Sequence, residues 1–237
     1  MGNPEDSIVK APAFKGFAQE TVLYIPADSN ARVIEKSLKE RAERDLELPM
    51  GRLYGLPGTS VLYGCIGAPA AVLALESLIS GGAEEIMLLG FCGSLCRRAR
   101  LLDAVSVTEA LSDEGTSRHY FADRKEFSPS LELRESMEQR IHSLGHALLP
   151  GAVVSTDAPY RETPSWRESW LDSGVDCVDM ETSAVFALAE FHGIRAASLL
   201  IVSDELDALG HNRAFNHPRM PEILQEYFLP FIHERLE

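Results

Sequence analysis

A strand, a helix and a second strand follow one another between residues 59 and 93, and this unit constrains the fold more than any other segment. Residues 59–67 (TSVLYGCIG) and 84–93 (EEIMLLGFCG) are short apolar runs typical of buried strands. Residues 68–82 (APAAVLALESLISGG) predict a helix, because glycines stand just past its end, where a left-handed cap is needed. Strands joined by a helix pair in parallel, so the unit predicts an α/β fold.

The rest of the chain continues this alternation. Further strands are predicted at 21–25, 103–111, 151–157 and 195–204. Further helices are predicted at 29–47, at 128–145 and within 175–194, where Gly193 closes the helix. A last helix is predicted at 221–236, where Pro230 is expected to bend or interrupt it. A length of 237 residues suits one large α/β domain, and no linker divides it. We therefore expect a mobile segment at 1–19 and a single domain at 20–237.

The composition disfavours several classes of partner. A formal net charge of −14 argues against nucleic acid, because proteins that bind it use Lys and Arg to neutralise phosphates. No apolar run approaches the roughly 20 residues that span a bilayer, so we expect no membrane contact. Four cysteines make no disulfide framework in a chain of this size, and no secretory signal opens it, which predicts a cytoplasmic protein with reduced thiols. A small-molecule partner is favoured.

Two carboxylates stand at the start of the helix predicted within VDCVDMETSAVFALAEFHGI, residues 175–194. Helical spacing puts Glu181 on the apolar stripe of that helix, where a carboxylate must be paired, hydrogen-bonded or ready for a ligand. Asp179 also suits a simpler role, the stabilisation of the positive helix N-terminus. Asp204 ends the next strand, at the sheet edge where α/β proteins bind ligands, although a structural turn is an equal alternative. The glycine turn GFCGS follows another strand end, so these features are expected on one rim.

These segments resemble the nucleoside phosphorylase family, which includes purine nucleoside phosphorylases, uridine phosphorylases and methylthioadenosine nucleosidases. VDMETSAVFALAEFHG is similar to the family's V-E-M-E helix start, and VSD to the end of its next strand. GFCGSL resembles its glycine turn, YIPADSNAR its P-G-D-P-x-R loop, and SDEGTSRHYF and STDAPYRE resemble loops of its phosphorylases. The resemblance implies a single α/β domain whose mixed β-sheet curls into a distorted barrel flanked by helices. It also implies an enzyme that cleaves the N-glycosidic bond of a nucleoside.

The resemblance assigns roles to individual residues. Glu181 would accept hydrogen bonds from the ribose 2′ and 3′ hydroxyls, and Met180 would pack beneath the sugar. Such a carboxylate stabilises the oxocarbenium-like charge that develops on the sugar as the base leaves. Asp204 would be the catalytic acid, sharing a proton with N7 of a purine-like base, which requires a raised pKa.

Further residues are expected beside the substrate. Asp179 is one, and the others are the turn residues Phe91, Cys92 and Gly93. Tyr160 neighbours the position where relatives stack an aromatic ring on the base, a position that holds Pro159 in this chain. A place in the core is the alternative for Tyr160.

The phosphate site departs from the family pattern. The family's Arg before the glycine turn is Leu88 here, and its Ser or Thr within the turn is Phe91. Arg32 and Arg161 are the phosphate ligands we expect instead, and the further candidates are Arg213, Arg219, and Arg41 or Arg44 of a neighbouring subunit. The family implies inorganic phosphate as a potential co-substrate, no metal and no organic cofactor. It also implies a homo-oligomer built from dimers, up to a hexamer.

Several hypotheses follow from these losses. In the first hypothesis, other arginines rebuild the anion site and the protein is a phosphorylase. In the second, water replaces phosphate and the protein is a hydrolytic nucleosidase. Alternatively, Phe91 fills the phosphate pocket and leaves a nucleoside-binding protein with little catalysis. A hypothesis from another enzyme class makes Cys92 the thiol nucleophile of an amidohydrolase, which needs a histidine partner. The basic segment CRRAR, residues 96–100, is expected to be a solvated loop or to form ion pairs between subunits, rather than an anion site.

Overall fold

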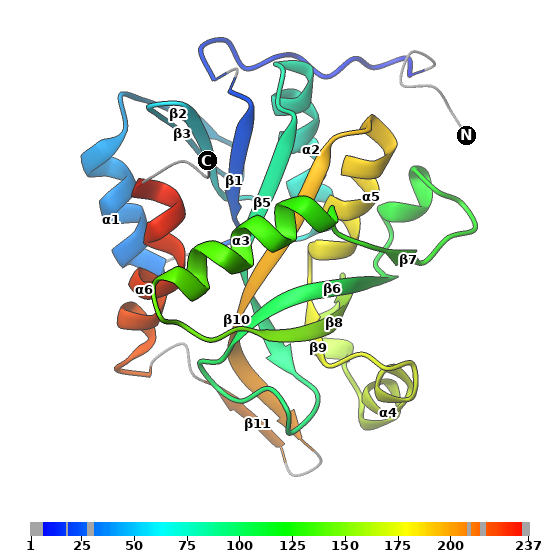
Figure 1. The fold of residues 1–237 in the computed structure, drawn as a ribbon. Helices are drawn as coiled ribbons and strands as arrows, with labels where there is room; N and C mark the ends of the chain where they lie inside the picture. Colours follow the sequence, from blue (N-terminus) through cyan, green and yellow to red (C-terminus); the bar gives the residue numbers. More distant parts are fainter. Residues whose placement is uncertain (1–6, 18, 28–30, 208–209, 214–216, 234–237) are drawn as a thin grey trace.

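The chain folds into strands and helices that alternate along most of its length, as Figure 1 shows for this computed structural model, which describes residues 7–17, 19–27, 31–207, 210–213 and 217–233. The helices are α1 (Arg32–Arg41), α2 (Ala68–Ser80), α3 (Leu131–Ser143), α4 (Pro164–Asp172), α5 (Thr182–His192) and α6 (Met220–His233). The strands are β1 (Thr21–Ile25), β2 (Arg44–Leu48), β3 (Gly51–Leu56), β4 (Thr59–Gly64), β5 (Glu85–Ser94), β6 (Ala104–Asp113), β7 (Glu126–Phe127), β8 (Leu149–Thr156), β9 (Cys177–Asp179), β10 (Arg195–Asp207) and β11 (Gly210–Arg213). Two short 3₁₀ helices lie at Ser117–His119 and Pro159–Arg161.

Five strands close into a barrel. They pair in the ring β10–β6–β8–β9–β5, which β5 and β10 complete by pairing in parallel. Strands β1, β4, β3 and β2 extend the sheet from β5, and β11 pairs antiparallel with β10. The predicted fold, a single α/β domain with a mixed sheet curled into a distorted barrel and flanked by helices, is confirmed.

Strand β5 belongs to both the barrel and the outer sheet. Its first half, Glu85 to Leu88, pairs with β1, and its last two residues, Gly93 and Ser94, pair with β9. The predicted parallel direction of the two strands that α2 joins is also confirmed, although they do not pair directly: β1 lies between β4 and β5 and is parallel to both. The carboxyl ends of β1, β4, β5 and β10 therefore point toward the same side of the sheet.

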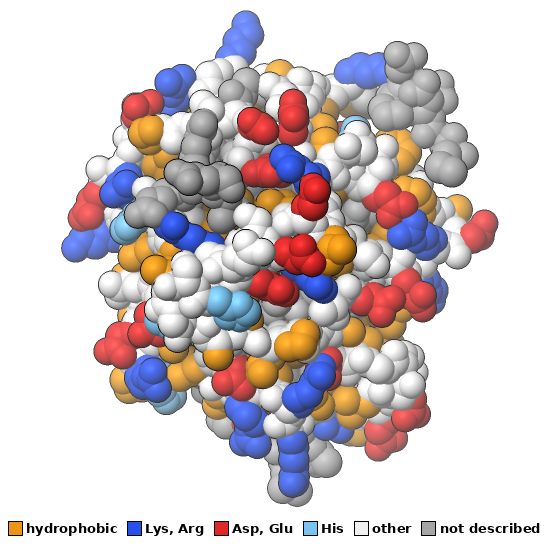
Figure 2. Space-filling view, viewed as in Figure 1, with side chains coloured by type: hydrophobic (Ala, Val, Ile, Leu, Met, Phe, Trp, Pro, Cys, Tyr) orange, Lys and Arg blue, Asp and Glu red, His pale blue; other side chains and the backbone are white. Residues whose placement is uncertain are grey.

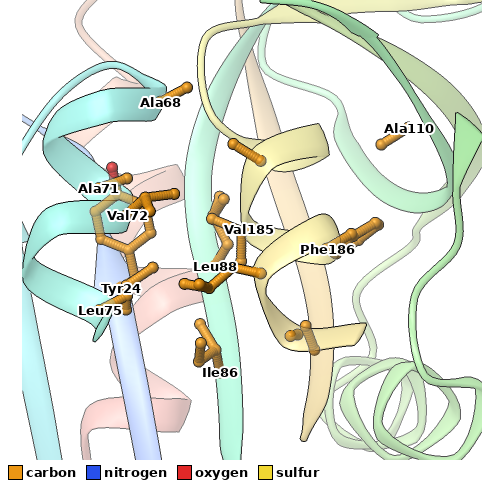
Figure 3. Packing of buried hydrophobic residues seen from close by; sticks show 14 of the residues in the cluster. Tyr24, Ala68, Ala71, Val72, Leu75, Ile86, Leu88, Ala110, Val185 and Phe186 are labelled. Carbon is orange, nitrogen blue, oxygen red and sulfur yellow. The ribbon is translucent and has the colours of Figure 1, made fainter. Parts of the chain in front are cut away.

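Helices cover both faces of this sheet. Figure 3 shows α2 and α5 on one face, where Leu88 of β5 packs between Tyr24 and Val185. On the other face α1 and α6 lie side by side and α3 crosses the sheet (Figure 1), burying Ile34 and Phe228. A smaller cluster beneath α4 includes Trp170 and Val178. Burial of both sheet faces explains why the strands are continuous apolar runs.

Two predicted helices differ from the observed elements. The helix predicted at 29–47 ends at Arg41, because Ala42 is extended, and residues 44–48 form β2 and pair antiparallel with β3. Of the two outcomes predicted at Pro230, an interruption is wrong, since α6 runs through this residue to His233, and a bend stays a prediction. Phe228 and Phe231 are buried on either side of Pro230 and hold both parts of the helix on the core.

Acidic and basic side chains are interspersed over the face drawn in Figure 2. Within the described residues, no helix is both long and apolar enough to cross a bilayer. The assignment of residues 1–19 to a mobile segment stays a prediction, and residues 1–6 and 18 of that segment lie outside the described part. Phe17 is buried against the core.

Candidate active site

A cavity of about 460 Å³ opens where the carboxyl ends of the strands meet. Its walls come from the ends of β1, β5, β9 and β10, the loop before α2, and the 3₁₀ helix at Pro159–Arg161. Its lining residues are Pro26, Ala27, Ile66, Phe91, Cys92, Gly93, Pro159, Tyr160, Glu162, Val178, Asp179, Met180, Glu181, Ser203, Asp204 and Leu206. A partly apolar cavity of this size, with a few convergent polar groups, suits a small-molecule ligand.

The structure brings most of the predicted site residues together in this cavity. Its lining includes the predicted acid and every residue expected beside the substrate, which are Asp204, Glu181, Met180, Asp179, Tyr160, Gly93, Cys92 and Phe91. Tyr160 is 94% exposed, so its alternative placement in the core is wrong. The two predicted phosphate ligands, Arg32 and Arg161, are exposed and do not line the cavity.

Glu181 is the N-cap residue of α5. The prediction from helical spacing, which places it on the apolar stripe of the helix, is therefore wrong. The difference arises because β9 runs to Asp179, so the chain enters the helix only at Thr182. The Glu181 side chain instead turns toward α2, where the backbone N–H of Gly67 donates to its Oε1 at 2.6 Å. Gly67 has a φ of +90°, which glycine adopts without strain.

Asp179 is held by several donors. Ser155 Oγ donates to its Oδ1 at 2.6 Å, and the N–H of Thr182 donates to its Oδ2 at 3.1 Å. The Thr182 hydroxyl also donates to Oδ2 in a short contact. Asp179 therefore fixes the start of α5, and with it Glu181, which agrees with the predicted helix N-terminal role.

A second carboxylate supports the same turn from behind. Ser155 Oγ also accepts from the N–H of Ser183 at 2.9 Å, and the Ser183 hydroxyl donates to Glu114 Oε1 at 3.2 Å. Glu114 in turn accepts from Ser112 Oγ at 2.7 Å. This chain of buried hydroxyls and carboxylates reaches from β6 to α5 and locks the turn that carries Glu181.

Burial dominates the electrostatics at Glu181. Loss of solvent, followed by the charge of Asp179, raises the pKa of Glu181 well above its usual range. Burial also raises the pKa of Asp179, against the effect of its hydrogen bonds. Donors from a ligand would favour the charged form of Glu181, so hydroxyl groups suit this position.

Asp204 reaches the cavity through an irregularity in β10. Val202 pairs with Cys92 and Asp204 with Gly93, so Ser203 is an extra residue in the pairing of β10 with β5. Ser203 Oγ donates to Asp204 Oδ1 at 2.7 Å. A Cβ on Gly93 would lie 2.9 Å from Asp204 Oδ2 and 2.5 Å from Leu206 Cδ1, so a larger residue here would displace both side chains from their positions. Bulges of this kind redirect side chains next to active sites.

Glu162 lines the same cavity, although no role is expected for it from the sequence. Burial, followed by the charge of Asp204, raises the pKa of Glu162 to about 7. Glu162 ends the segment STDAPYRE, just before the helix cap Thr163, and this position alone gives only a weak indication that its side chain belongs to the site. Below, the Asp204 side means Glu162, Ser203 and Asp204, and the Glu181 side means Asp179, Met180 and Glu181.

Cys92 lacks the surroundings of a nucleophile. A hydrogen bond with Cys177, followed by burial, raises the pKa of the Cys92 thiol well above its usual range. Reactive thiols need the opposite shift, because the thiolate is the nucleophile. The described lining of the cavity contains no histidine. The structure therefore gives the amidohydrolase hypothesis no support.

The expected anion site is not rebuilt by the described side chains. The lining carries four carboxylates and, in the described ranges, no Arg or Lys. Leu88 is buried in the core, and Phe91 packs on Phe228 with ring centroids 6.1 Å apart. Arg44 donates to the carbonyl of Gly16. The side chain of Arg213 lies outside the described part.

Other charged groups have structural partners. In segment 96–100, Arg98 pairs with Asp176, and Arg100 pairs with Glu205 at 2.7 Å, so both arginines are paired within the chain and the expected ion pairs between subunits stay a prediction. The described part of the chain holds no cluster of three or more His, Cys, Asp or Glu side chains able to bind a metal.

Comparisons of sequence agree with this geometry. The sequence profile of the Phosphorylase superfamily matches residues 24–222. Guanosine phosphorylase of Halorubrum lacusprofundi is 31% identical over 157 residues, which span 66% of this chain and 65%, slightly less than two thirds, of that protein. A DeoD-type purine nucleoside phosphorylase of Caldanaerobacter subterraneus subsp. tengcongensis is 30% identical over 205 residues, 82% of this chain and 86% of that protein.

Solved structures share the fold. Purine nucleoside phosphorylase from Toxoplasma gondii, in complex with immucillin-H, superposes with a TM-score of 0.71 at 21% identity, over 96% of this chain and 99% of that one. AMP nucleosidase from Bacteroides thetaiotaomicron gives a TM-score of 0.66 at 19% identity, over 78% of this chain and 81% of that one. The profile covers most of the chain and the fold is shared, so the predicted resemblance is confirmed and the chain belongs to the Phosphorylase superfamily.

Proposed function

We propose that this protein cleaves the N-glycosidic bond of a nucleoside with a purine-like base. The observation that carries the proposal is the meeting of Glu181, Met180 and Asp204 in one cavity at the carboxyl ends of the strands. Support also comes from the relatives, which are named guanosine phosphorylase and purine nucleoside phosphorylase.

The Glu181 side suits the sugar. Glu181 is anchored by the N–H of Gly67 through Oε1, and its position beside the cavity suits acceptance of the ribose 2′ and 3′ hydroxyl protons. As the base leaves, positive charge spreads over the sugar ring, and a fixed carboxylate stabilises it more strongly than water does. Met180 supplies an apolar surface that excludes water from the ring.

The Asp204 side suits the base. In this proposal Asp204 shares a proton with N7, so that the base departs as a neutral molecule rather than an anion. Phe91, Cys92 and Gly93 of β5 line the same cavity, and Tyr160 and Pro159 approach it from another wall. These contacts provide flat, largely apolar surface for a purine ring.

The acceptor of the sugar divides the proposal into two candidates. Phosphorolysis, our first candidate, is supported by the names of the relatives, and it requires cations from Arg32, Arg161, another arginine or a second subunit. Hydrolysis is favoured by one specific observation, the four carboxylates in the described cavity lining without Arg or Lys, because a phosphate dianion needs charge-assisted donors.

Release of free base tests the proposal and separates these candidates. Guanosine, inosine and adenosine are incubated with the protein, with and without phosphate, and the sugar product is identified. Ribose 1-phosphate formed only with phosphate marks a phosphorylase, and free ribose formed at a phosphate-independent rate marks a nucleosidase. Binding in a calorimeter without release of base would contradict catalysis and support the nucleoside-binding alternative.

Two further expectations belong to this proposal. A homo-oligomer built from dimers follows from the family, and light scattering of the purified protein measures its mass. The cytoplasmic location also stays a prediction, which localisation of the tagged protein tests.

A further inference from the structure

Glu162 is held rigidly against the cavity. It follows the 3₁₀ helix, in which the N–H of Arg161 donates to Ala158 O at 2.8 Å. It precedes Thr163, whose hydroxyl caps α4 by accepting from the N–H of Trp166 at 3.3 Å. Capped turns on both sides leave the backbone of Glu162 little freedom.

A clamp ties this segment to the strand that carries Asp204. Arg167 of α4 donates through Nε to the carbonyl of Leu206 at 2.6 Å, and through Nη2 to the carbonyl of Leu95. Leu206 lies two residues after Asp204 and lines the same cavity. Glu162 and Asp204 line this cavity together, although the sequence separates them widely.

Asp204 is the charged group that acts on Glu162. The neighbouring Arg161 is exposed, the guanidinium of Arg167 is used by two carbonyl oxygens, and Glu205 pairs with Arg100. Burial, followed by the negative charge of Asp204, raises the pKa of Glu162 to about 7. When two carboxyl groups share a site, the pKa of one of them is raised, so the pair can hold one proton between them.

We propose that Glu162 is a second catalytic carboxyl of this site, which forms a proton-sharing pair with Asp204 and delivers the proton to the leaving base. This inference rests on the proposed N-glycosidic cleavage. It adds a residue to the reaction: Glu162 supplies the proton that Asp204 shares with N7, and the nearby charge of Asp204 keeps that proton on Glu162 until the base leaves.

The proposed step is balanced as follows. The C1′–N9 electron pair goes to the base as that bond breaks, and N7 takes the proton that Glu162 and Asp204 share. The acceptor oxygen, of water or of phosphate, bonds to C1′, and the proton that this acceptor releases restores the Glu162 carboxyl. A base that already carries a positive charge needs no such proton, so it leaves without help from Glu162.

This last point supplies the test. Base release from guanosine and from 7-methylguanosine, whose base is already cationic, is measured for the wild type and Glu162→Gln. With guanosine we expect kcat of the variant to fall roughly 30-fold or more, within the range for lost acid catalysis, and with 7-methylguanosine about 3-fold or less. Glu168→Gln, at an exposed position on α4, is the matched control and should leave both substrates unaffected.

The pH dependence supplies a second readout. For the wild type, kcat with guanosine should fall as the pH rises above about 7, the raised pKa of Glu162. Glu162→Gln should lose that fall, whereas Glu162→Asp, which keeps a carboxyl, should retain a fall with pH. Equal losses of kcat on both nucleosides, or no loss on either, would overturn the role of Glu162. Absence of base release by the wild type with every nucleoside would instead overturn the proposed function itself.

Discussion

The two acidic sides of the cavity are built in different ways. On the Glu181 side, Asp179 accepts from two hydroxyls and from backbone N–H groups, and Gly67 N–H fixes Glu181. On the Asp204 side, Asp204 accepts from the neighbouring Ser203, and Glu162 stands between two turns. The first arrangement resembles a core network, whereas the second places a partly buried Glu162, whose pKa is raised to about 7, near Asp204.

Under the proposed function, the two sides would serve two different tasks in glycosidic cleavage. A carboxylate that binds hydroxyls must keep its place, and a network of fixed donors provides this. A carboxyl that exchanges a proton must have a pKa near the working pH, and partial burial beside a second carboxylate provides this. We therefore expect substitutions on the two sides to change different kinetic parameters.

The largest effect is expected for Asp204→Asn. The variant should lose roughly 10²- to 10⁴-fold in kcat with purine nucleosides, the usual contribution of acid catalysis, and change KM far less. Steady-state rates of base release give both parameters. Equal losses in kcat and in binding would assign Asp204 to ligand binding and remove the contrast between the two sides.

A smaller effect is expected for Glu181→Ala. Loss of charged hydrogen bonds to the ribose hydroxyls, worth about 1.5–3 kcal/mol each, should raise KM and lower kcat together, with kcat/KM reduced roughly 100-fold. A 2′-deoxynucleoside offers the control, because it lacks one of the hydroxyls and should be less sensitive to the substitution. Wild-type kinetics for the variant would refute the ribose assignment.

Substitutions in the hydrogen-bond network behind Glu181 should lower the stability of the protein. Ser155→Ala removes the donor to Asp179 and the acceptor of Ser183 N–H, both of which are buried. The free energy of unfolding should fall by about 1–3 kcal/mol, measured by urea denaturation. Ser143→Ala, on an exposed hydroxyl that bonds only the local carbonyl of Arg140, is the control and should change little. A loss no larger than the control's would show that the network is not a structural core.

The smallest effect is expected in the pH dependence of stability without ligand. The pKa of Glu181 lies above its ordinary value of 4.5 in the folded protein, so the native state binds more protons than the unfolded state above that pH. The stabilisation is complete below pH 4.5 and is lost as the pH rises through the raised pKa, so the melting temperature should fall between about pH 5 and 8. Glu181→Gln should flatten this slope. A melting temperature that rises over this interval would contradict the raised pKa.

Much of the fold was predictable because the central strands are buried on both faces. Val22 to Ile25 and Ile86 to Leu89 are fully or almost fully buried, so their sequences are unbroken apolar runs. Strand β2 was missed because its residues are mostly exposed and charged, and its pairing with β3 replaces burial as the stabilising interaction. Strand β9 was missed because three residues carry too little periodicity to separate a strand from a helix start.

The site was predictable where its residues lie at strand ends. Asp204 and the glycine turn follow apolar runs, so their common edge could be inferred. The N-cap position of Glu181 could not be inferred from the sequence, because it depends on the pairing of β9 with β8 and β5. The approach of Glu162 to Asp204 depends on the clamp of Arg167 on Leu206, a tertiary contact with no local signature.

The sharing of β5 between barrel and outer sheet has a consequence for cooperativity. Its first residues bond β1, its last residues bond β9, and β10 runs beside it throughout. Neither sheet can separate from the other without breaking this one strand's hydrogen bonds, so barrel and outer sheet should unfold in a single transition. The amide hydrogens of β5 should then exchange with solvent only when the whole molecule opens, which makes them the slowest reporters of its global stability.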